Sequence, residues 1–486
     1  MKGFKSLIAL ALLGCIFCGP TAQAQNTDEL IPVIESAESV FLTAIQAYED
    51  RDFETAARLF GVVANTFDLH EKTTASLLMR GKSLYMAGDY TQASLVLNDF
   101  VAKYRTSRYL PDAQLILQFA NEATSGDVQD TEFMKLGVAL PLNKEASTFT
   151  QQMFNGIKLA VDDHNAVPYD TLTGNPIRKI KLIFRDTQNQ QGAAQDAIRS
   201  LAAENVDAII GPLFSNEALA AAQIAEQERI VMITPMATDD AVSRDRRYTF
   251  QANPTIETRG RLMARMAIIG LGLNELGVLA DYNNRESVRM ARAFEAEASA
   301  LEANVTFNEQ IVNSRSWFRL SETVSRDTLL TADAIYLPIN GGNASNLIGG
   351  ALTSLDRMGI SSRMRLLGNV EWHNISQVSL AGKYTTTYSN DFYAVPTDSV
   401  TMEFEERYMS LTGGEISQLA YKGYDVATFM AQQLHRQSME SRPLEQIMRE
   451  APLFQGYANR LDFTAGNVNE AMFFHRFKDG TVELIR

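Results

Sequence analysis

Two hydroxyl-bearing residues follow strand-like apolar runs and could bind charged groups of a small molecule. Ser215 comes between the run 207–210 and the polar start of a helical segment, where its hydroxyl and free backbone N–H groups can meet a carboxylate. Thr238 follows the run 230–234, and its hydroxyl together with the Met236 carbonyl could receive an ammonium. The same two residues could instead be a helix N-cap and a turn residue, so both interpretations stay open.

Residue patterns for catalysis or metal binding are missing from the sequence. The five histidines show no paired spacing of metal ligands, and His373, beside Trp372, is the one nearest the expected site. Gly270 and Gly272 precede a strand-like run instead of following one, which excludes a dinucleotide loop. No nucleophile elbow or Walker loop is present. The sequence therefore predicts a binding protein and not an enzyme, with no catalytic residue, no metal and no cofactor.

The segments that must position these hydroxyls alternate between strand and helix. From Phe133 onward, short β-branched runs are separated by amphipathic helical stretches, which predicts a parallel sheet covered on both faces. A second series of the same kind follows, so we expect two doubly wound lobes with a cleft between them. The expected strands are 135–140, 180–184, 207–210 and 230–234 in the first series, and 276–280, 334–337 and 364–367 in the second.

Residues 28–125 have helical periodicity throughout. A pattern recurs there at one constant interval, with Tyr48, Asp52, Phe53 and Ala56 returning as Tyr85, Asp89, Tyr90 and Ala93. The interval is close to that of a tetratricopeptide repeat, and the alternative is an ordinary helical hairpin. The polar stretch 121–130 predicts a linker, hence separate cores and a module that can be removed without unfolding the rest.

The N-terminus has the pattern of an export signal. Two lysines precede an apolar run at 7–18, and small residues at 22–24 follow at cleavage spacing, which predicts a signal peptide over residues 1–24 and a periplasmic protein. Cys15 also ends a lipobox-like segment, so a lipid-anchored form is the alternative. Because Cys15 and Cys18 are the only cysteines of the chain, cleavage after Ala24 would leave no thiol.

Composition limits the number of domains and the kinds of partner that the chain can have. With 486 residues, 45% of them hydrophobic, the chain is long enough for two or three globular domains. The net charge of -14 argues against nucleic acid as a partner, since nucleic-acid binding depends on clustered Lys and Arg.

Several segments, in order and spacing, resemble the leucine/isoleucine/valine-type branch of the type I periplasmic solute-binding proteins over residues 133–486. They are Gly137–Pro141, then Gly156, Ala160 and Asn165, Asp186–Gln188, Ile210–Pro212 with Ser215, Thr234–Thr238, and Tyr424–Asp425. The helical stretch resembles tetratricopeptide repeats, and together the two parts resemble penicillin-binding protein activator lipoproteins.

The resemblance implies an α/β bilobed type I periplasmic-binding fold, at 132–486, after an all-α tetratricopeptide-like module at 28–125. Three crossings between the lobes would put about 133–252 and 400–455 in lobe 1, and about 256–390 and 460–486 in lobe 2. Ser215 and Thr238, with the Met236 carbonyl, match the positions where the family binds its ligand.

The residues expected to line the cleft from lobe 2 differ from the pattern of the family. Asn340 stands where the family has a tyrosine, and Arg285 or Tyr282 where it has another aromatic. Glu371, the acidic residue that would balance an ammonium, comes one position late, with Trp372 beside it. These departures put simple α-amino-acid binding in doubt.

Two functions remain as hypotheses. The first is a periplasmic solute-binding protein that closes on a small polar, amino-acid-like ligand and serves a membrane transporter or sensor. The second is a non-catalytic periplasmic scaffold or regulator of cell-wall synthesis, which contacts a cell-envelope protein through the helical repeats.

Overall fold

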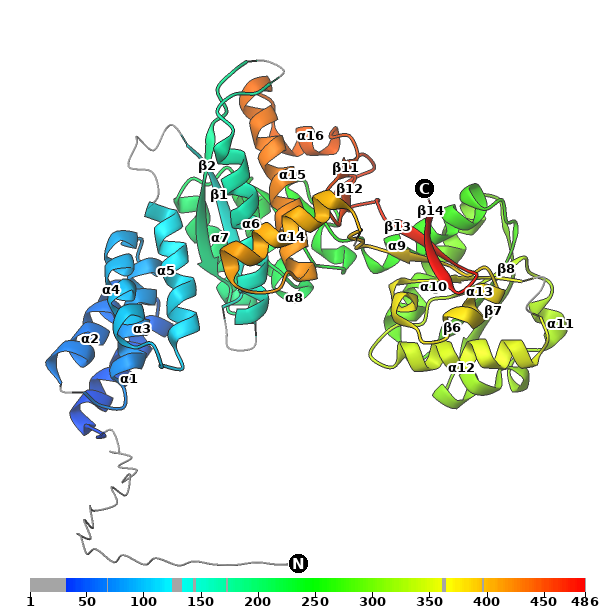
Figure 1. Cartoon of the computed structure of the whole chain (residues 1–486), viewed down its shortest axis with the longest axis horizontal. Coiled ribbons are helices and arrows are strands. Elements are labelled where there is room, and N and C mark those ends of the chain that lie inside the picture. Colours follow the sequence, from blue (N-terminus) through cyan, green and yellow to red (C-terminus); the bar gives the residue numbers. More distant parts are fainter. Residues whose placement is uncertain are drawn as a thin grey trace, which may run out of the picture.

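The computed structural model describes residues 32–67, 69–124, 133–142, 146–171, 174–360, 364–395 and 397–485. A helical module and two α/β lobes follow one another along the longest axis of the molecule (Figure 1). The predicted signal peptide and lipobox, and residues 125–130 of the predicted linker, lie outside the described residues.

The helical module consists of antiparallel helices that repeat their own local chemistry. Asp52 accepts a hydrogen bond from the Thr55 N–H, and Asp89 accepts one from the Gln92 N–H, both at 3.1 Å, so the two aspartates cap equivalent helices. The helices are α1 (Glu35–Glu49), α2 (Phe53–Thr66), α3 (Thr73–Met86), α4 (Tyr90–Lys103) and α5 (Leu110–Thr124). The first residues of the predicted linker thus belong to α5.

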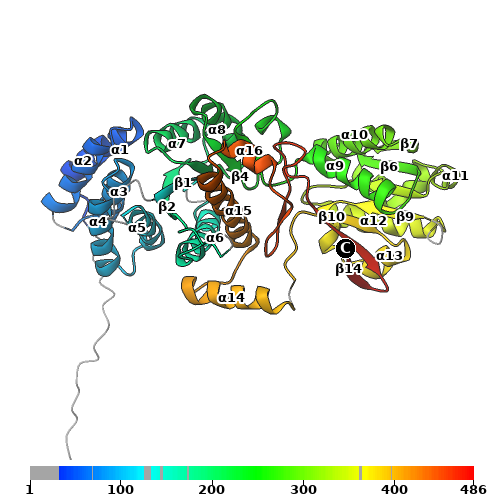
Figure 2. The same ribbon diagram turned by 90° about the horizontal axis from the view of Figure 1, so that it is seen from above.

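Lobe 1 is built on a five-stranded parallel sheet of order β2-β1-β3-β4-β5 with helices on both faces (Figure 2). Its strands are β1 (Phe133–Leu140), β2 (Lys179–Asp186), β3 (Ala208–Ile210), β4 (Val231–Thr234) and β5 (Thr249–Gln251). Its helical elements are α6 (Ser147–Ala166), α7 (Gln191–Ala203), α8 (Ser215–Glu228), the short η1 (Asp240–Val242), α14 (Ser399–Thr412), α15 (Gln418–Glu440) and α16 (Leu444–Arg449).

Glycines bring the late helix α15 against α6. A Cβ on Gly156 would lie 2.0 Å from the Ala420 carbonyl oxygen, and a Cβ on Gly423 would lie 2.3 Å from the Met153 carbonyl oxygen. Only a glycine at each position permits this approach of two helix backbones. The contact returns the late part of the chain to lobe 1.

Lobe 2 has a seven-stranded sheet of order β14-β13-β10-β9-β8-β6-β7, in which β13 runs antiparallel to both of its neighbours, β10 and β14. The strands are β6 (Glu275–Asp281), β7 (Asn304–Ile311), β8 (Ala334–Leu337), β9 (Arg365–Gly368), β10 (Thr387–Asn390), β13 (Phe473–Lys478) and β14 (Thr481–Ile485). The main helical elements are α9 (Ile256–Arg265), α10 (Arg285–Ala300), α12 (Ala344–Arg357), η4 (Val370–Asn374) and α13 (Val378–Lys383). The bilobed α/β architecture with an all-helical N-terminal segment agrees with the prediction.

Three segments join the lobes. One connects β5 to α9, one connects β10 to α14, and the last leads from the small hairpin β11 (Phe454–Gln455) and β12 (Arg460–Leu461) to β13. These segments form the hinge region, and the candidate site lies beside them.

The expectation that the module and lobe 1 have separate cores is wrong. One hydrophobic cluster runs from Leu97 and Phe119 of the module into β1, β2 and α6. The Phe119 ring stacks on the Phe184 ring with centroids 3.6 Å apart, and it meets the Phe154 ring edge-on at 4.5 Å. Helix α5 therefore covers the outer strand of lobe 1, as a helix of the lobe itself would.

Polar contacts strengthen this junction. The Tyr85 hydroxyl lies 2.9 Å from both the N–H and the carbonyl oxygen of Phe184, and so satisfies the backbone of edge strand β2. The buried Arg185 guanidinium donates to Glu204 at 2.9 Å and to the Tyr90 hydroxyl at 3.0 Å. Lys82 of the module pairs with Asp186 at 2.7 Å. The module is thus fixed on lobe 1 by apolar and charged contacts together.

None of the helices in the described ranges is long and apolar enough to cross a membrane.

Candidate functional site

The Ser215 hydroxyl organises a turn at the carboxyl ends of β3 and β4. Ser215 is the first residue of α8, after the N-cap residue Phe214, and its Oγ accepts hydrogen bonds from the N–H groups of Thr238 at 3.1 Å and Asp239 at 3.2 Å. Ser215 and Thr238 are therefore adjacent, and both are partly exposed. Ser215 is not an N-cap, and its hydroxyl proton is not needed for these two bonds.

Beneath this turn lies a buried carboxylate. Glu217 Oε1 accepts the Phe214 N–H at 3.3 Å, and its other oxygen accepts the hydroxyl of Thr187. Burial raises the pKa of the Glu217 carboxyl, and these hydrogen bonds oppose the rise. Glu217 thus holds the strand-to-helix connection that presents Ser215.

Met236 lies between the two candidate residues in sequence but packs toward the core. Its side chain is partly buried against the hydrophobic cluster of lobe 1. A ligand contact from Met236 would therefore come from its backbone carbonyl, as predicted.

Two of the predicted lobe 2 residues lie beyond the ends of β8 and β9. The Asn340 side chain donates to Glu286 of α10, while the backbone carbonyl oxygen of Asn340 accepts from the Asn284 side-chain amide at 2.8 Å. Glu371 follows β9, and burial raises the pKa of its carboxyl, a rise that the Gly341 N–H and Arg259 oppose and nearby Glu286 reinforces. Asn340, Glu286 and Glu371 form a polar, acidic wall on lobe 2.

Trp372 does not face a ligand. Its side chain is fully buried in the core of lobe 2, and its indole N–H donates to the Leu337 carbonyl at 3.2 Å. A Cβ on Gly368 would lie 2.4 Å from the Trp372 ring, so the ring packs directly on β9. The sequence placed it at the site because it adjoins Glu371, but η4 turns the two side chains into different surroundings.

Charged residues that the sequence did not reveal are buried in the hinge region. Arg259 of α9 pairs with Asp391, at the start of the second crossing, at 2.6 Å. Burial opposes ionisation of Asp391, but Arg259 and Lys422 keep the pKa of its carboxyl below the usual range. Lys422 enters from α15 of lobe 1, within 3.5 Å of Asn253 in the first crossing, and burial lowers its pKa. Charges from both lobes thus meet at the hinge.

Asp425 ties the β11–β12 hairpin, from which the third crossing starts, to α15 of lobe 1. Its carboxylate accepts the N–H groups of Tyr457 at 2.8 Å, Ala458 at 3.0 Å and Asn459 at 2.9 Å, as well as the Asn459 side-chain amide at 2.7 Å. Two ionisable residues in the mainly apolar run of α15, Lys422 and Asp425, were the available sequence signal for this buried hinge chemistry.

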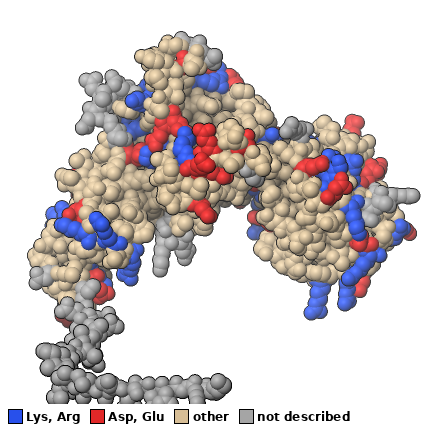
Figure 3. All heavy atoms as spheres, in the orientation of Figure 1, with Lys and Arg blue, Asp and Glu red and all other residues tan. Residues whose placement is uncertain are grey.

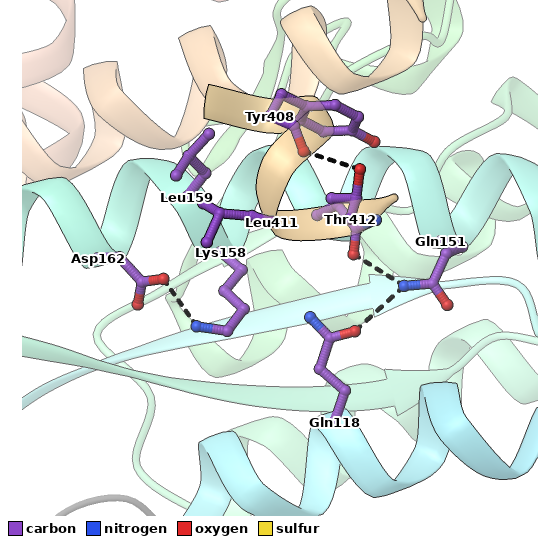
Figure 4. A pocket seen from close by; sticks show the side chains of 9 residues that line it. Gln118, Gln151, Lys158, Leu159, Asp162, Tyr408, Leu411 and Thr412 are labelled. Atoms are coloured by element: carbon purple, nitrogen blue, oxygen red, sulfur yellow. Dashed lines mark hydrogen bonds and ion pairs between the residues drawn. The ribbon is translucent and has the colours of Figure 1, made fainter. Parts of the chain in front are cut away.

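Cavities lie where the module meets lobe 1. A polar pocket of about 390 Å³ opens between α5, α6 and α14, and in it Gln151 donates to Gln118 at 3.1 Å while Lys158 pairs with Asp162 (Figure 4). A larger cavity, of about 750 Å³, lies between α1, α3 and the start of α7. Neither contains a predicted site residue.

The surface is mixed in charge. Asp and Glu side chains gather over α14, whose sequence includes Glu403, Glu405 and Glu406, and Lys and Arg occur over the module and lobe 2 (Figure 3). Within the part of the chain that the structure describes, no three His, Cys, Asp or Glu residues are grouped as a metal site would need.

Comparison with known proteins agrees with this architecture. A family model described as periplasmic binding protein matches residues 134–481. A putative branched-chain amino acid ABC transporter protein from Rhodospirillum rubrum is 20% identical with a TM-score of 0.59, over 73% of this chain and 100% of that one. A substrate-binding protein from Desulfitobacterium hafniense, in complex with Leu, is 20% identical with a TM-score of 0.51, over 73% and 100%. At such identity these likenesses show the fold.

None of the curated proteins compared matches the chain. The family match covers both lobes and leaves out the helical module, and it spans well over half of the 486 residues. The chain therefore belongs to the periplasmic binding protein family, which is non-catalytic.

Proposed function

We propose that this protein binds a small polar, amino-acid-like solute between its lobes and serves a membrane transporter or sensor. The observation that carries the proposal is the pair of hydrogen bonds from the Thr238 and Asp239 N–H groups to the Ser215 hydroxyl. They support a lobe 1 site in which two hydroxyls lie together where ligands of doubly wound sheets bind, beyond the carboxyl ends of strands.

The chemistry of the opposite wall supports a ligand with a cationic group. Glu286 and Glu371 provide carboxylates and Asn340 provides an amide, while the Ser215 hydroxyl retains a proton to donate. A zwitterion would place its carboxylate toward lobe 1 and its ammonium toward lobe 2. One of the solved relatives is in complex with Leu, which makes branched-chain amino acids the first ligands to test.

A thermal-shift screen of the mature protein against amino acids, small peptides and cell-wall fragments tests this proposal. A solute that binds only the folded state raises the melting temperature by mass action. Thr238→Val should then weaken affinity roughly ten- to a hundredfold, the effect of losing one hydrogen bond to a charged group. Ser325→Ala, which removes the N-cap of a distant lobe 2 helix, is the control. Unchanged affinity in Thr238→Val would refute the site.

Ser215→Ala needs separate treatment because the hydroxyl also has a structural role. The variant leaves the Thr238 and Asp239 N–H groups without their acceptor, so it should lose about 1–3 kcal/mol of stability as well as affinity. Ser215→Thr retains the oxygen and should recover the stability.

The second candidate function is a scaffold or regulator of cell-wall synthesis, resembling penicillin-binding protein activators and contacting a cell-envelope protein through tetratricopeptide-like repeats. The core shared between the module and lobe 1 favours it, because a simple solute carrier needs no rigidly attached helical module. A negative ligand screen would give this candidate the lead.

We place the protein in the periplasm, after cleavage of a signal peptide at 1–24. Metabolic fatty-acid labelling that is lost in Cys15→Ala would show the lipid-anchored form instead.

A further inference from the structure

An arginine of lobe 2 reaches across to lobe 1. Arg289, on α10, has Nη2 3.2 Å from Asp240 Oδ1 and 3.6 Å from Asp239 Oδ1, and both aspartates belong to lobe 1. Its Nε lies 2.5 Å from Glu257 Oε1 of α9, within lobe 2. The guanidinium is therefore held by its own lobe while it pairs with the other.

The lobe 1 end of this bridge is continuous with the candidate site. The N–H groups of Thr238 and Asp239 both donate to the Ser215 hydroxyl, and the Asp239 carboxylate accepts the Ala241 N–H at 3.1 Å. The turn that carries Thr238 is thus attached to Ser215 on its own lobe and to Arg289 on the opposite lobe. Backbone contacts add to these: Gln251 of β5 donates to the carbonyl oxygens of Ala237 and Asp239, and the Ile256 N–H at the start of α9 donates to the Thr238 carbonyl oxygen at 3.1 Å.

The ion pairs of Arg289 with Asp239 and Asp240 are weak enough to break and re-form. The side chains of Arg289, Asp239 and Asp240 are 33%, 47% and 27% exposed, so solvent and salt screen their attraction. Arg244 also pairs with Asp240 within lobe 1. Asp240 is thus shared between a partner that stays with its lobe and a partner that moves with the other lobe.

We propose that Arg289 is a positioning residue that holds the 238–240 turn against lobe 2 and biases the opening between the lobes. Its importance for ligand affinity rests on the proposed solute binding. Its effect on the distance between the lobes needs no ligand, so the two ideas can fail separately.

Distances between spin labels test the proposal in the ligand-free protein. Cys15 and Cys18, replaced by serine, leave no other native thiol, so Gln227→Cys on α8 and Ser299→Cys on α10 take the labels at exposed positions. Double electron–electron resonance then gives the interlobe distance distribution for the parent chain, Arg289→Gln and Arg289→Lys. Arg292→Gln, exposed on the same helix, is the matched control.

Arg289→Gln should shift the ratio of open to closed populations by up to about fivefold, as expected for loss of a partly exposed ion pair. Arg289→Lys should restore most of the parent distribution, high salt should move the parent toward the glutamine variant, and Arg292→Gln should change nothing. An Arg289→Gln distribution identical to that of the parent would overturn the proposal. A shifted distribution together with a negative ligand screen would support it and count against solute binding.

Discussion

Replacing Phe119 by alanine should destabilise lobe 1, although Phe119 lies in the helical module. The ring is 1% exposed, stacks on Phe184 at 3.6 Å and meets Phe154 at 4.5 Å. Removal of a buried phenylalanine typically costs 3–5 kcal/mol through lost burial and the cavity left behind, and we expect about 4 kcal/mol here. That is a large part of the 5–15 kcal/mol that stabilises a typical domain.

Phe294→Ala is the matched control in lobe 2. Its ring is also fully buried, and it stacks on Tyr336 at 4.5 Å, in a cluster that contains no residue of the module or lobe 1. Its loss should have a similar energetic cost, confined to lobe 2.

Hydrogen–deuterium exchange read by mass spectrometry separates the two cases. In Phe119→Ala, protection should fall together in peptides of α5 and β2 and remain in β6 and β8; in Phe294→Ala the pattern should be reversed. If α5 lost protection while β2 kept its parent exchange rate, the shared core would not be a cooperative unit, and the module would be separable after all.

Two further predictions concern Asp425 in the hinge region and His475 in β13 of lobe 2. Asp425→Ala removes the acceptor of four hydrogen bonds, so it should cost about 3–5 kcal/mol and raise exchange in residues 457–459; normal protection there would contradict the assigned role. Burial, reinforced by His373, lowers the pKa of His475 to about 4, below its ordinary 6.5. The unfolded chain takes up the proton more readily than the folded chain does. The contribution of neutral His475 to the free energy of unfolding is therefore complete above pH 6.5, and it falls by about 3 kcal/mol as the pH drops to 4. Denaturant titrations of the parent and His475→Phe should diverge across that window, and parallel curves would refute the assignment.

The alternation of strand-like and helical segments from Phe133 onward was sufficient to predict two doubly wound lobes. The spacing of apolar residues within each strand or helix is a local property, so it can be read from the sequence. Ser215 and Thr238 both follow strand ends, and the Ser215 hydroxyl accepts the Thr238 N–H, because parallel strands end at one edge of a sheet and the positions after β3 and β4 are fixed by that rule. The recurrence of Asp52 as Asp89 likewise corresponded to two capped helices.

Other features depended on which distant segments meet. The polar stretch 121–130 indicated independent parts, yet α5 covers β2, since nothing local in Phe119 specifies that its partner is Phe184. Trp372 follows the candidate ligand-binding residue Glu371 in sequence. Its ring nevertheless packs in the core, because Gly368 has no side chain to occupy that space.

The pairing of charges also depended on the tertiary structure and not on the sequence alone. Composition gave the net charge of -14, but the pairing of Arg289 with Asp240 and of Arg259 with Asp391 requires three crossings that bring remote segments to one hinge. The sequence by itself determined the fold class, the seven strands β1 to β4, β6, β8 and β9, and the edge of the sheet on which the candidate hydroxyls lie. Only the tertiary structure decided which surfaces are covered and which charges meet, because burial and electrostatic attraction depend on proximity in space, which residue spacing along the chain does not encode.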